Sequence, residues 1–160
     1  PTGLKGVLVY LLVYTFMTLG AFLVLTSLAK QGIAGDDIND LRGLMKRAPG
    51  HALWMLVFMV SLAGIPPTAG FIGKFYIFWG LIETGHYTLA VIGAVYVVVA
   101  IYYYFRIVKA VFVEPEEAEA GSLTVSFGTR AGLAVTGVLT LALGVYPEPV
   151  LRLAQMSISR

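Results

Sequence analysis

One lysine of this sequence, Lys74, lies inside an apolar stretch that two consecutive prolines interrupt. Apolar residues continue beyond it from Phe75 to Ile82, so the amine is distant from either end of the stretch. Charged side chains are unfavourable in hydrocarbon and usually face a protein interior or a water-filled cavity. Burial also disfavours the charged form of an amine. The pattern therefore predicts that Lys74 gains and loses a proton and acts as a proton relay.

The interruption before Lys74 explains how its amine is tolerated. Pro66 and Pro67 remove two backbone donors, and Gly70 and Gly73 loosen the turns that follow. Carbonyl groups freed at such a break must be satisfied by neighbouring helices or by water, and a cation beside them is solvated without bulk water. The alternative is a lysine whose long side chain extends to the lipid headgroups. The two apolar turns that follow Lys74 favour the relay.

Hydroxyl groups and one carboxylate are candidates for a hydrated path. Tyr10, Tyr14 and Thr18 recur every four residues, so they share one face of a helix. They line a hydrated path in one interpretation, and in the other their hydroxyls are satisfied between packed helices. Tyr76 and Glu83 are further candidates for the path. Glu83 ends the apolar stretch, where it is either a proton exit or a plain surface carboxylate.

The composition places much of the chain in lipid. Of the 160 residues, 58% are hydrophobic and only 12% are charged, with a mean hydropathy of +0.84; soluble domains carry about 25% charge. The absence of cysteine excludes disulfide scaffolds, thiolate metal sites and iron–sulfur clusters in this chain. A net charge of +2 does not indicate a nucleic-acid partner. No dinucleotide or nucleotide motif is present.

A helix needs roughly 20 apolar residues to cross a bilayer. The sequence therefore predicts an all-α integral membrane protein with about four transmembrane crossings, at residues 6–28, 52–82, 87–113 and 130–145. The second crossing is a broken helix, interrupted at residues 66–70. Because the chain begins with Pro1, we expect residues 1–160 to form a single membrane domain that is a fragment of a longer protein.

Basic residues indicate how the broken stretch crosses. If residues 52–82 cross once, one side of the membrane holds seven Lys and Arg residues and the other holds three; a hairpin divides them six and four. Cytoplasmic loops carry an excess of Lys and Arg, which favours the single crossing. The loops at residues 30–50 and 114–122 are then cytoplasmic. The seven residues are Lys30, Arg42, Lys46, Arg47, Arg106, Lys109 and Arg130.

Several motifs resemble one known family. Asp40-Leu41-Arg42-Gly43-Leu44 and, above all, the run from Ser61 to Tyr76, SLAGIPPTAGFIGKFY, closely resemble subunit N of the proton-pumping NADH–quinone oxidoreductase, respiratory complex I. The run from Tyr10 to Phe22 is similar to the preceding helix in that subunit. A broader form of the proline–lysine run is shared with sister subunits and with multisubunit cation/proton antiporters. The Gly73–Tyr76 ending favours subunit N or its photosynthetic counterpart.

The resemblance implies a fold and a role. The chain would be the C-terminal part of an inverted-repeat, antiporter-like bundle, and Lys74 matches the lysine of its second broken helix. The implied function is proton translocation through that lysine, coupled to quinone reduction in other subunits. This chain would thus be a translocase subunit without a catalytic redox site. The first repeat of the family has no counterpart here, so the chain is too short for a complete pump.

The resemblance also implies partners and location. The partners are other membrane and peripheral subunits of complex I, neighbouring antiporter-like subunits, and the lipid bilayer. Flavin, iron–sulfur clusters and quinone belong to partner subunits, and no cofactor or metal is expected in this chain. The location is the bacterial cell inner membrane, or the thylakoid for the photosynthetic counterpart. The alternatives are a stand-alone or multisubunit cation/proton antiporter without redox activity, and a structural bundle in which Lys74 pairs with lipid phosphate.

Overall fold

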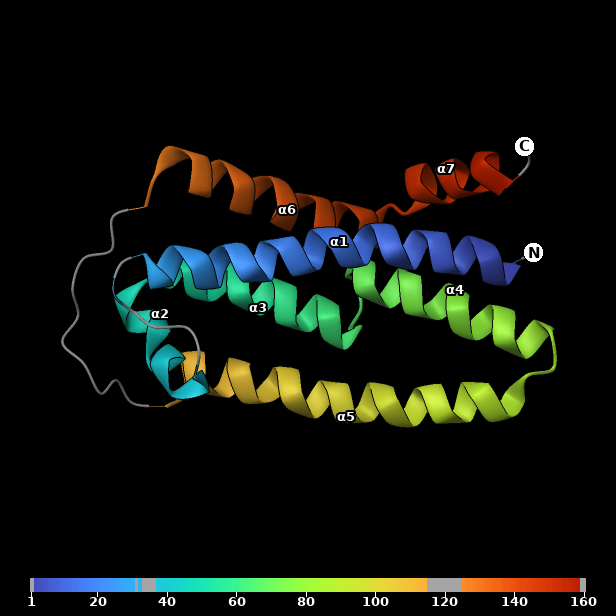
Figure 1. Cartoon of the computed structure of the whole chain (residues 1–160), viewed down its shortest axis with the longest axis horizontal. Helices are drawn as coiled ribbons and strands as arrows, with labels where there is room; N and C mark the ends of the chain where they lie inside the picture. The colour runs from blue at the N-terminus through green and yellow to red at the C-terminus, as the bar shows by residue number, and fades with distance from the viewer. Residues whose placement is uncertain (1, 31, 33–36, 115–124, 159–160) are drawn as a thin grey trace.

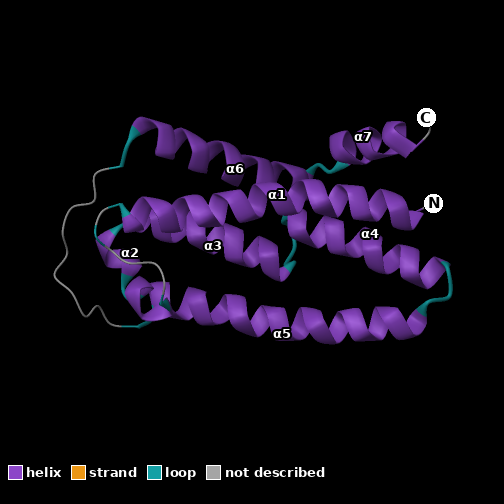
Figure 2. Cartoon of the chain, viewed as in Figure 1, coloured by secondary structure: helices purple, strands orange, loops and turns teal. Residues whose placement is uncertain are grey.

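The computed structural model describes residues 2–30, 32, 37–114 and 125–158, whose regular elements are all helical (Figures 1 and 2). The predicted all-α fold is confirmed. The elements are α1 (Thr2–Ala29), the 3-10 helix η1 (Ile38–Leu41), α2 (Leu44–Arg47), α3 (Pro49–Ala63), α4 (Ala69–Glu83), α5 (Tyr87–Phe112), α6 (Phe127–Val145) and α7 (Glu148–Ile158).

Three helices, α1, α5 and α6, are long and apolar enough to cross a membrane, and α3 is a shorter apolar helix. Figure 1 shows that α4 runs on in the direction of α3. The two 15-residue helices therefore form one interrupted crossing and not a hairpin. This agrees with the expected broken second crossing.

The α3–α4 break covers residues 64–68, two residues before the expected 66–70. Helix α3 ends because Gly64 adopts a left-handed conformation, with φ of +83°. That conformation lets the Gly64 and Ile65 amides donate to the carbonyls of Ser61 and Val60, which closes the helix end. The glycine, and not the proline pair that follows it, thus sets the end of α3. Gly70 lies in the first turn of α4, outside the break.

Helix α1 lies at the centre of the bundle, in contact with α3, α4, α6 and α7. It buries an apolar stripe that includes Val9, Val13 and Val24. Small residues bring it very close to α4: a side chain at Gly6 would meet the backbone of Tyr76. Close backbone approach at small residues is how membrane helices gain contact without a hydrophobic driving force. Helix α1 therefore fixes the position of α4 along the axis of the bundle.

The last crossing differs from its prediction at its start, and it ends at Val145 as expected. Helix α6 begins at Phe127 instead of residue 130, because the Ser126 hydroxyl accepts the Thr129 amide and caps the helix. After α6 ends, α7 continues in the same direction beside α1 (Figure 1). The sequence analysis did not predict α7. Its Pro147-Glu148-Pro149 segment reads as a stop, but prolines also fit the first turn of a new helix.

In the polar segment at residues 30–50, where a loop was expected, the described residues 37–50 form short helices and the start of α3. Within its described part, Asp37 caps η1 by accepting the Asn39 amide, and α2 follows directly. Arg42 then pairs with Glu114 at 2.9 Å, which ties this segment to the end of α5. Of the predicted loop at 114–122, Glu114 is described, and residues 115–122 lie outside the described residues.

Gly144, at the end of α6, offers a test of how the bundle closes on the break. A Cβ at this position would overlap the Pro67 carbonyl and the Thr68 backbone, whereas a Cβ at Gly128 meets open space. We expect Gly144→Ala to lower the unfolding free energy by about 1–3 kcal/mol through overpacking. Gly128→Ala should be neutral or slightly stabilising, since alanine favours a helix. Thermal unfolding of the full-length protein in detergent measures both; equal midpoints would contradict this packing.

Candidate functional site

The Lys74 side chain reaches back across the α3–α4 break, from α4 to the end of α3. Lys74 lies in the second turn of α4, and its Nζ donates to the carbonyl oxygens of Leu62 at 2.8 Å and Ala63 at 3.2 Å. Leu62 and Ala63 are the last two residues of α3. Their carbonyl oxygens accept no hydrogen bond from an amide of the same helix. The amine therefore caps the end of the preceding half-helix, and the side chain is partly buried there.

Ser61 makes the reciprocal connection from α3 to α4. Its side chain is fully buried, and its hydroxyl accepts the Gly70 amide at 3.1 Å, in the first turn of α4. The same hydroxyl donates to the Met17 sulfur of α1 at 2.7 Å. Within the break, the Thr68 hydroxyl donates to the Ile65 carbonyl at 2.7 Å. Polar groups on both sides of the break are thus satisfied inside the protein, as a low-dielectric setting requires.

Three glycines allow these short connections. A Cβ at Gly64 would press on the Lys74 side chain, and one at Gly70 would overlap the Ser61 carbonyl. A Cβ at Gly73 would crowd the backbone and ring of Tyr10 on α1. Gly70 and Gly73 therefore allow other residues to pack closely against α4. The sequence predicts instead that they loosen the turns after the break.

Two of the predicted path residues, Tyr14 and Thr18, line a cavity of about 220 Å³ between α1, α3 and α5. Leu62, whose carbonyl accepts Lys74, and Tyr104 line it as well. The Thr18 hydroxyl is buried and has no hydrogen-bond partner among the described residues. Such a group gains a partner if water enters the cavity. Tyr10 instead lies against Gly73 and 5.5 Å from the Tyr14 ring.

The remaining candidates lie away from the amine. The Tyr76 ring is 5.9 Å from the Lys5 ammonium, on the α1 side of α4. Glu83 is exposed at the end of α4 and accepts the Trp79 indole N–H at 2.8 Å. Nine residues of helix separate it from Lys74, or about 13 Å along the axis. The structure brings neither Tyr76 nor Glu83 to the Lys74 amine.

In this geometry, two opposing effects act on the protonation of the Lys74 amine. The carbonyl end of a helix carries partial negative charge and stabilises a cation. Removal from water disfavours that same cation. An amine under such a balance changes its protonation when a nearby charge changes, which is the chemistry that a relay needs. Among the described residues no group of three or more His, Cys, Asp or Glu side chains could hold a metal ion.

Sequence reasoning missed Ser61 and Gly144 as parts of this site. Ser61 lies within the SLAGIPPTAG run, nine residues before Gly70. Helical periodicity does not continue across the break, so it does not predict a contact between these two residues. Gly144 comes from a helix 76 residues after Thr68 in the chain. A small residue three positions before a proline-rich stop was the one available signal, and it does not identify the partner.

Comparison with known proteins places the chain in a family of membrane proteins. Residues 1–100 match the family described as NADH:quinone oxidoreductase/Mrp antiporter, transmembrane. The chain is 57% identical over 159 residues to NADH-quinone oxidoreductase subunit N 2 of Solibacter usitatus, covering 99% of this chain and 32% of that protein. For subunit N 1 of Koribacter versatilis, the identity is 52%, over 99% and 31%. The chain thus spans about a third of the length of these curated relatives.

Solved structures agree with the sequence comparison. A chain of respiratory complex I from Thermus thermophilus with bound aureothin is similar at a TM-score of 0.77 and 38% identity. The match covers 90% of this chain and 33% of that one. A chain of the T. thermophilus complex with bound NADH matches at a TM-score of 0.61 and 21% identity, over 97% and 42%, which shows a shared fold.

Ser61→Ala tests the connection across the break. Removing the hydroxyl leaves the buried Gly70 amide without its acceptor, so we expect a loss of about 1–3 kcal/mol and faster hydrogen exchange at that amide. Ser157→Ala is the control, because Ser157 is exposed at the end of α7. Amide exchange of the full-length protein, followed by mass spectrometry over the first turn of α4, measures the effect. Unchanged exchange in Ser61→Ala would show that the hydroxyl does not hold the break.

Proposed function

The chain belongs to the NADH:quinone oxidoreductase/Mrp antiporter membrane family, and we propose that it is the C-terminal part of subunit N of a proton-pumping NADH–quinone oxidoreductase. Identities of 57% and 52% to proteins of that name, over nearly the whole chain, support the proposal. So does the 38% identity to a chain of a solved respiratory complex I.

In this proposal Lys74 is the protonatable group of a proton pathway. The observation that carries the proposal is the pair of hydrogen bonds from its amine to the last carbonyls of α3. A cation so placed can release its proton without leaving unsatisfied carbonyls, because a neutral amine still has N–H donors. Gly64, Gly70, Gly73 and the prolines hold the break in the shape that brings amine and carbonyls together.

The energy scale of such a relay is accessible. Moving one elementary charge against 100 mV requires about 2.3 kcal/mol, and a change of one pKa unit corresponds to about 1.4 kcal/mol. A charge arriving near Lys74 could therefore drive the proton off or on. The cavity beside Tyr14 and Thr18 is where we place water of the pathway, since it offers hydroxyl groups and the unpartnered Thr18 oxygen.

The proposal includes partners and a location. Quinone reduction takes place in other subunits, which hold the flavin, the iron–sulfur clusters and the quinone, while this chain takes part in proton translocation. The other membrane and peripheral subunits of complex I are its partners. The relatives compared above are bacterial proteins, and we propose the bacterial cell inner membrane as the location.

The second candidate is a cation/proton antiporter without redox activity. The matched family includes Mrp antiporters, which is the observation that favours this candidate. The subunit N relatives, at up to 57% identity, favour the redox complex.

Substitution of Lys74 tests the relay in the assembled complex. We expect Lys74→Ala to reduce proton pumping per NADH oxidised by about tenfold or more, with the complex still assembled. Lys74→Arg should also impair pumping, because a guanidinium does not deprotonate. Pumping is measured by the quenching of a pH-sensitive dye in membrane vesicles. Lys109→Ala is the control, since Lys109 forms an exposed ion pair with Glu114; normal pumping in Lys74→Ala would contradict the relay.

Purification of the full-length protein by a tag tests its place in a redox complex. We expect flavin and iron–sulfur absorbance to co-purify with it in mild detergent, together with NADH-dependent quinone reduction. A complex that carries cation/proton exchange but no flavin would instead support the antiporter.

A further inference from the structure

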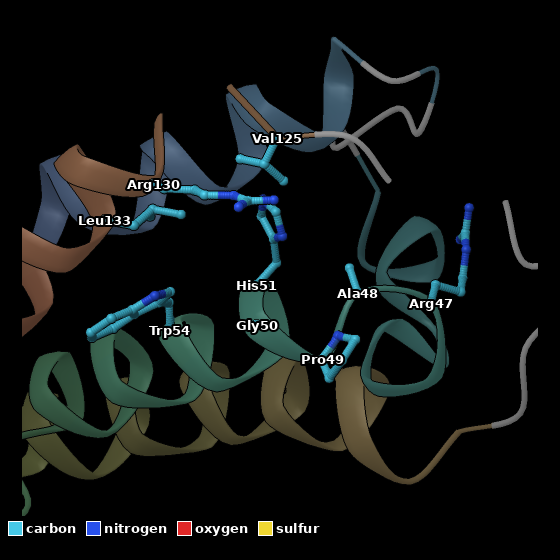
Figure 3. Close-up of a pocket in the computed structure, with 9 residues that line it drawn as sticks. All are labelled: Arg47, Ala48, Pro49, Gly50, His51, Trp54, Val125, Arg130 and Leu133. Atoms are coloured by element: carbon cyan, nitrogen blue, oxygen red, sulfur yellow. The ribbon is translucent and has the colours of Figure 1, made fainter. Parts of the chain in front are cut away.

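A pocket of about 370 Å³ opens between the first turns of α3 and α6, far from the α3–α4 break. Backbone at Ala48, Pro49 and Gly50 lines one side of it. Figure 3 shows that Arg130 extends from α6 toward His51 across the pocket. The nearby Arg47 side chain points away from it. The described groups at the mouth of this pocket are therefore a guanidinium, an imidazole and helix-end amides.

The Arg130 guanidinium and the helix-end amides give the pocket a positive character. None of the described residues that line it is acidic. Arg130 takes part in none of the ion pairs found among the described residues, such as Arg42–Glu114 and Arg152–Glu148. Pro49 has no N–H, so the amides at the start of α3 without an acceptor in the helix are those of Gly50 and His51, and they carry partial positive charge. An anion in this pocket would meet donors from two helices.

His51 is fixed in place by α1. Its ring is buried, with 5% of its surface exposed, and its Nε2 lies 2.7 Å from the Ser27 hydroxyl. The Arg130 side chain reaches toward the same ring from α6, as Figure 3 shows. The position of the pocket wall is thus set by packing among α1, α3 and α6 and does not depend on a flexible surface side chain alone.

Deeper along the two helices the pocket wall becomes apolar. Trp54 and Leu133 each lie about one turn further from the basic end than His51 and Arg130. The Trp54 ring is stacked on Phe58, with 6.3 Å between centroids, and it lies against Gly137 of α6. A ligand that fits both parts carries a negative group at one end and hydrocarbon at the other.

We propose that this pocket binds an anionic phospholipid, with its phosphate between Arg130 and the first turn of α3 and an acyl chain against Trp54 and Leu133. The pocket lies at the end of the bundle where α2, the end of α5 and the start of α6 carry Lys46, Arg47, Arg106, Lys109 and Arg130. Basic pockets between membrane helices at such a charged interface suit anionic headgroups. The apolar wall favours a lipid over a free anion, which gains nothing from Trp54. This proposal needs only that the chain crosses a membrane, and it does not depend on the role of Lys74.

Photo-crosslinking in the assembled complex tests the site. The complex is placed in nanodiscs that contain phosphatidylglycerol with a photoreactive group in the acyl chain, and the labelled peptides are mapped. We expect labelling in the peptides that contain Trp54 and Leu133. Arg130→Gln should reduce this labelling by about tenfold, because it removes a charge-assisted contact to phosphate. Arg130→Lys should retain most of it, which separates lost charge from misfolding.

The controls distinguish the ligand and the position. Arg152→Gln removes an exposed arginine of α7, at the other end of the bundle, and should leave labelling unchanged. A phosphatidylcholine probe of the same chain length should label weakly. The proposal is overturned if Arg130→Gln labels as the unsubstituted protein does, or if both lipids label equally. Binding of inorganic phosphate at Arg130 without labelling by the lipid probe would also overturn it, in favour of a soluble anion.

Discussion

The carbonyl groups at the end of α3 are the constraint on which the site depends. A helix that ends within a membrane exposes carbonyls that lipid cannot satisfy, and in this chain the Lys74 amine donates to the last two of them. The amine comes from the second turn of the next half-helix, so one side chain both closes the break and carries an exchangeable proton. A break without Lys74 would lack its cap, and Lys74 without the break would lack its acceptors.

The neighbouring helices hold the Lys74 amine and the carbonyls of α3 in place relative to each other. Helix α1 contributes Met17, which accepts the Ser61 hydroxyl, and Tyr10, which lies against Gly73. Helix α6 contributes Gly144, whose lack of a side chain admits Pro67 and Thr68. The contacts at Gly73 and Gly144 depend on the absence of a side chain where two helices or a helix and the break approach closely. The break is therefore a product of two neighbouring helices, α1 and α6, and not a local property of its two prolines.

The sequence predicts the helices and the lysine well because both depend on local pattern. Apolar runs of helical length identify α1, α5 and α6, and a charged residue inside such a run identifies Lys74. The position of the break depends on the left-handed Gly64, which no periodicity reveals. Ser61, Gly144 and α7 depend on contacts between residues far apart in the chain. The interpretations of Lys74, Tyr10, Tyr14, Thr18, Tyr76 and Glu83 as a proton path remain predictions.

An experimental structure of the full-length protein in its complex, at a resolution that defines side chains, tests the central claim most directly. The account predicts the Lys74 nitrogen within about 3.2 Å of the Leu62 and Ala63 carbonyl oxygens, with α3 ended at Gly64. A continuous helix through Pro66 and Pro67, or a Lys74 amine extended to the lipid headgroups, would contradict it.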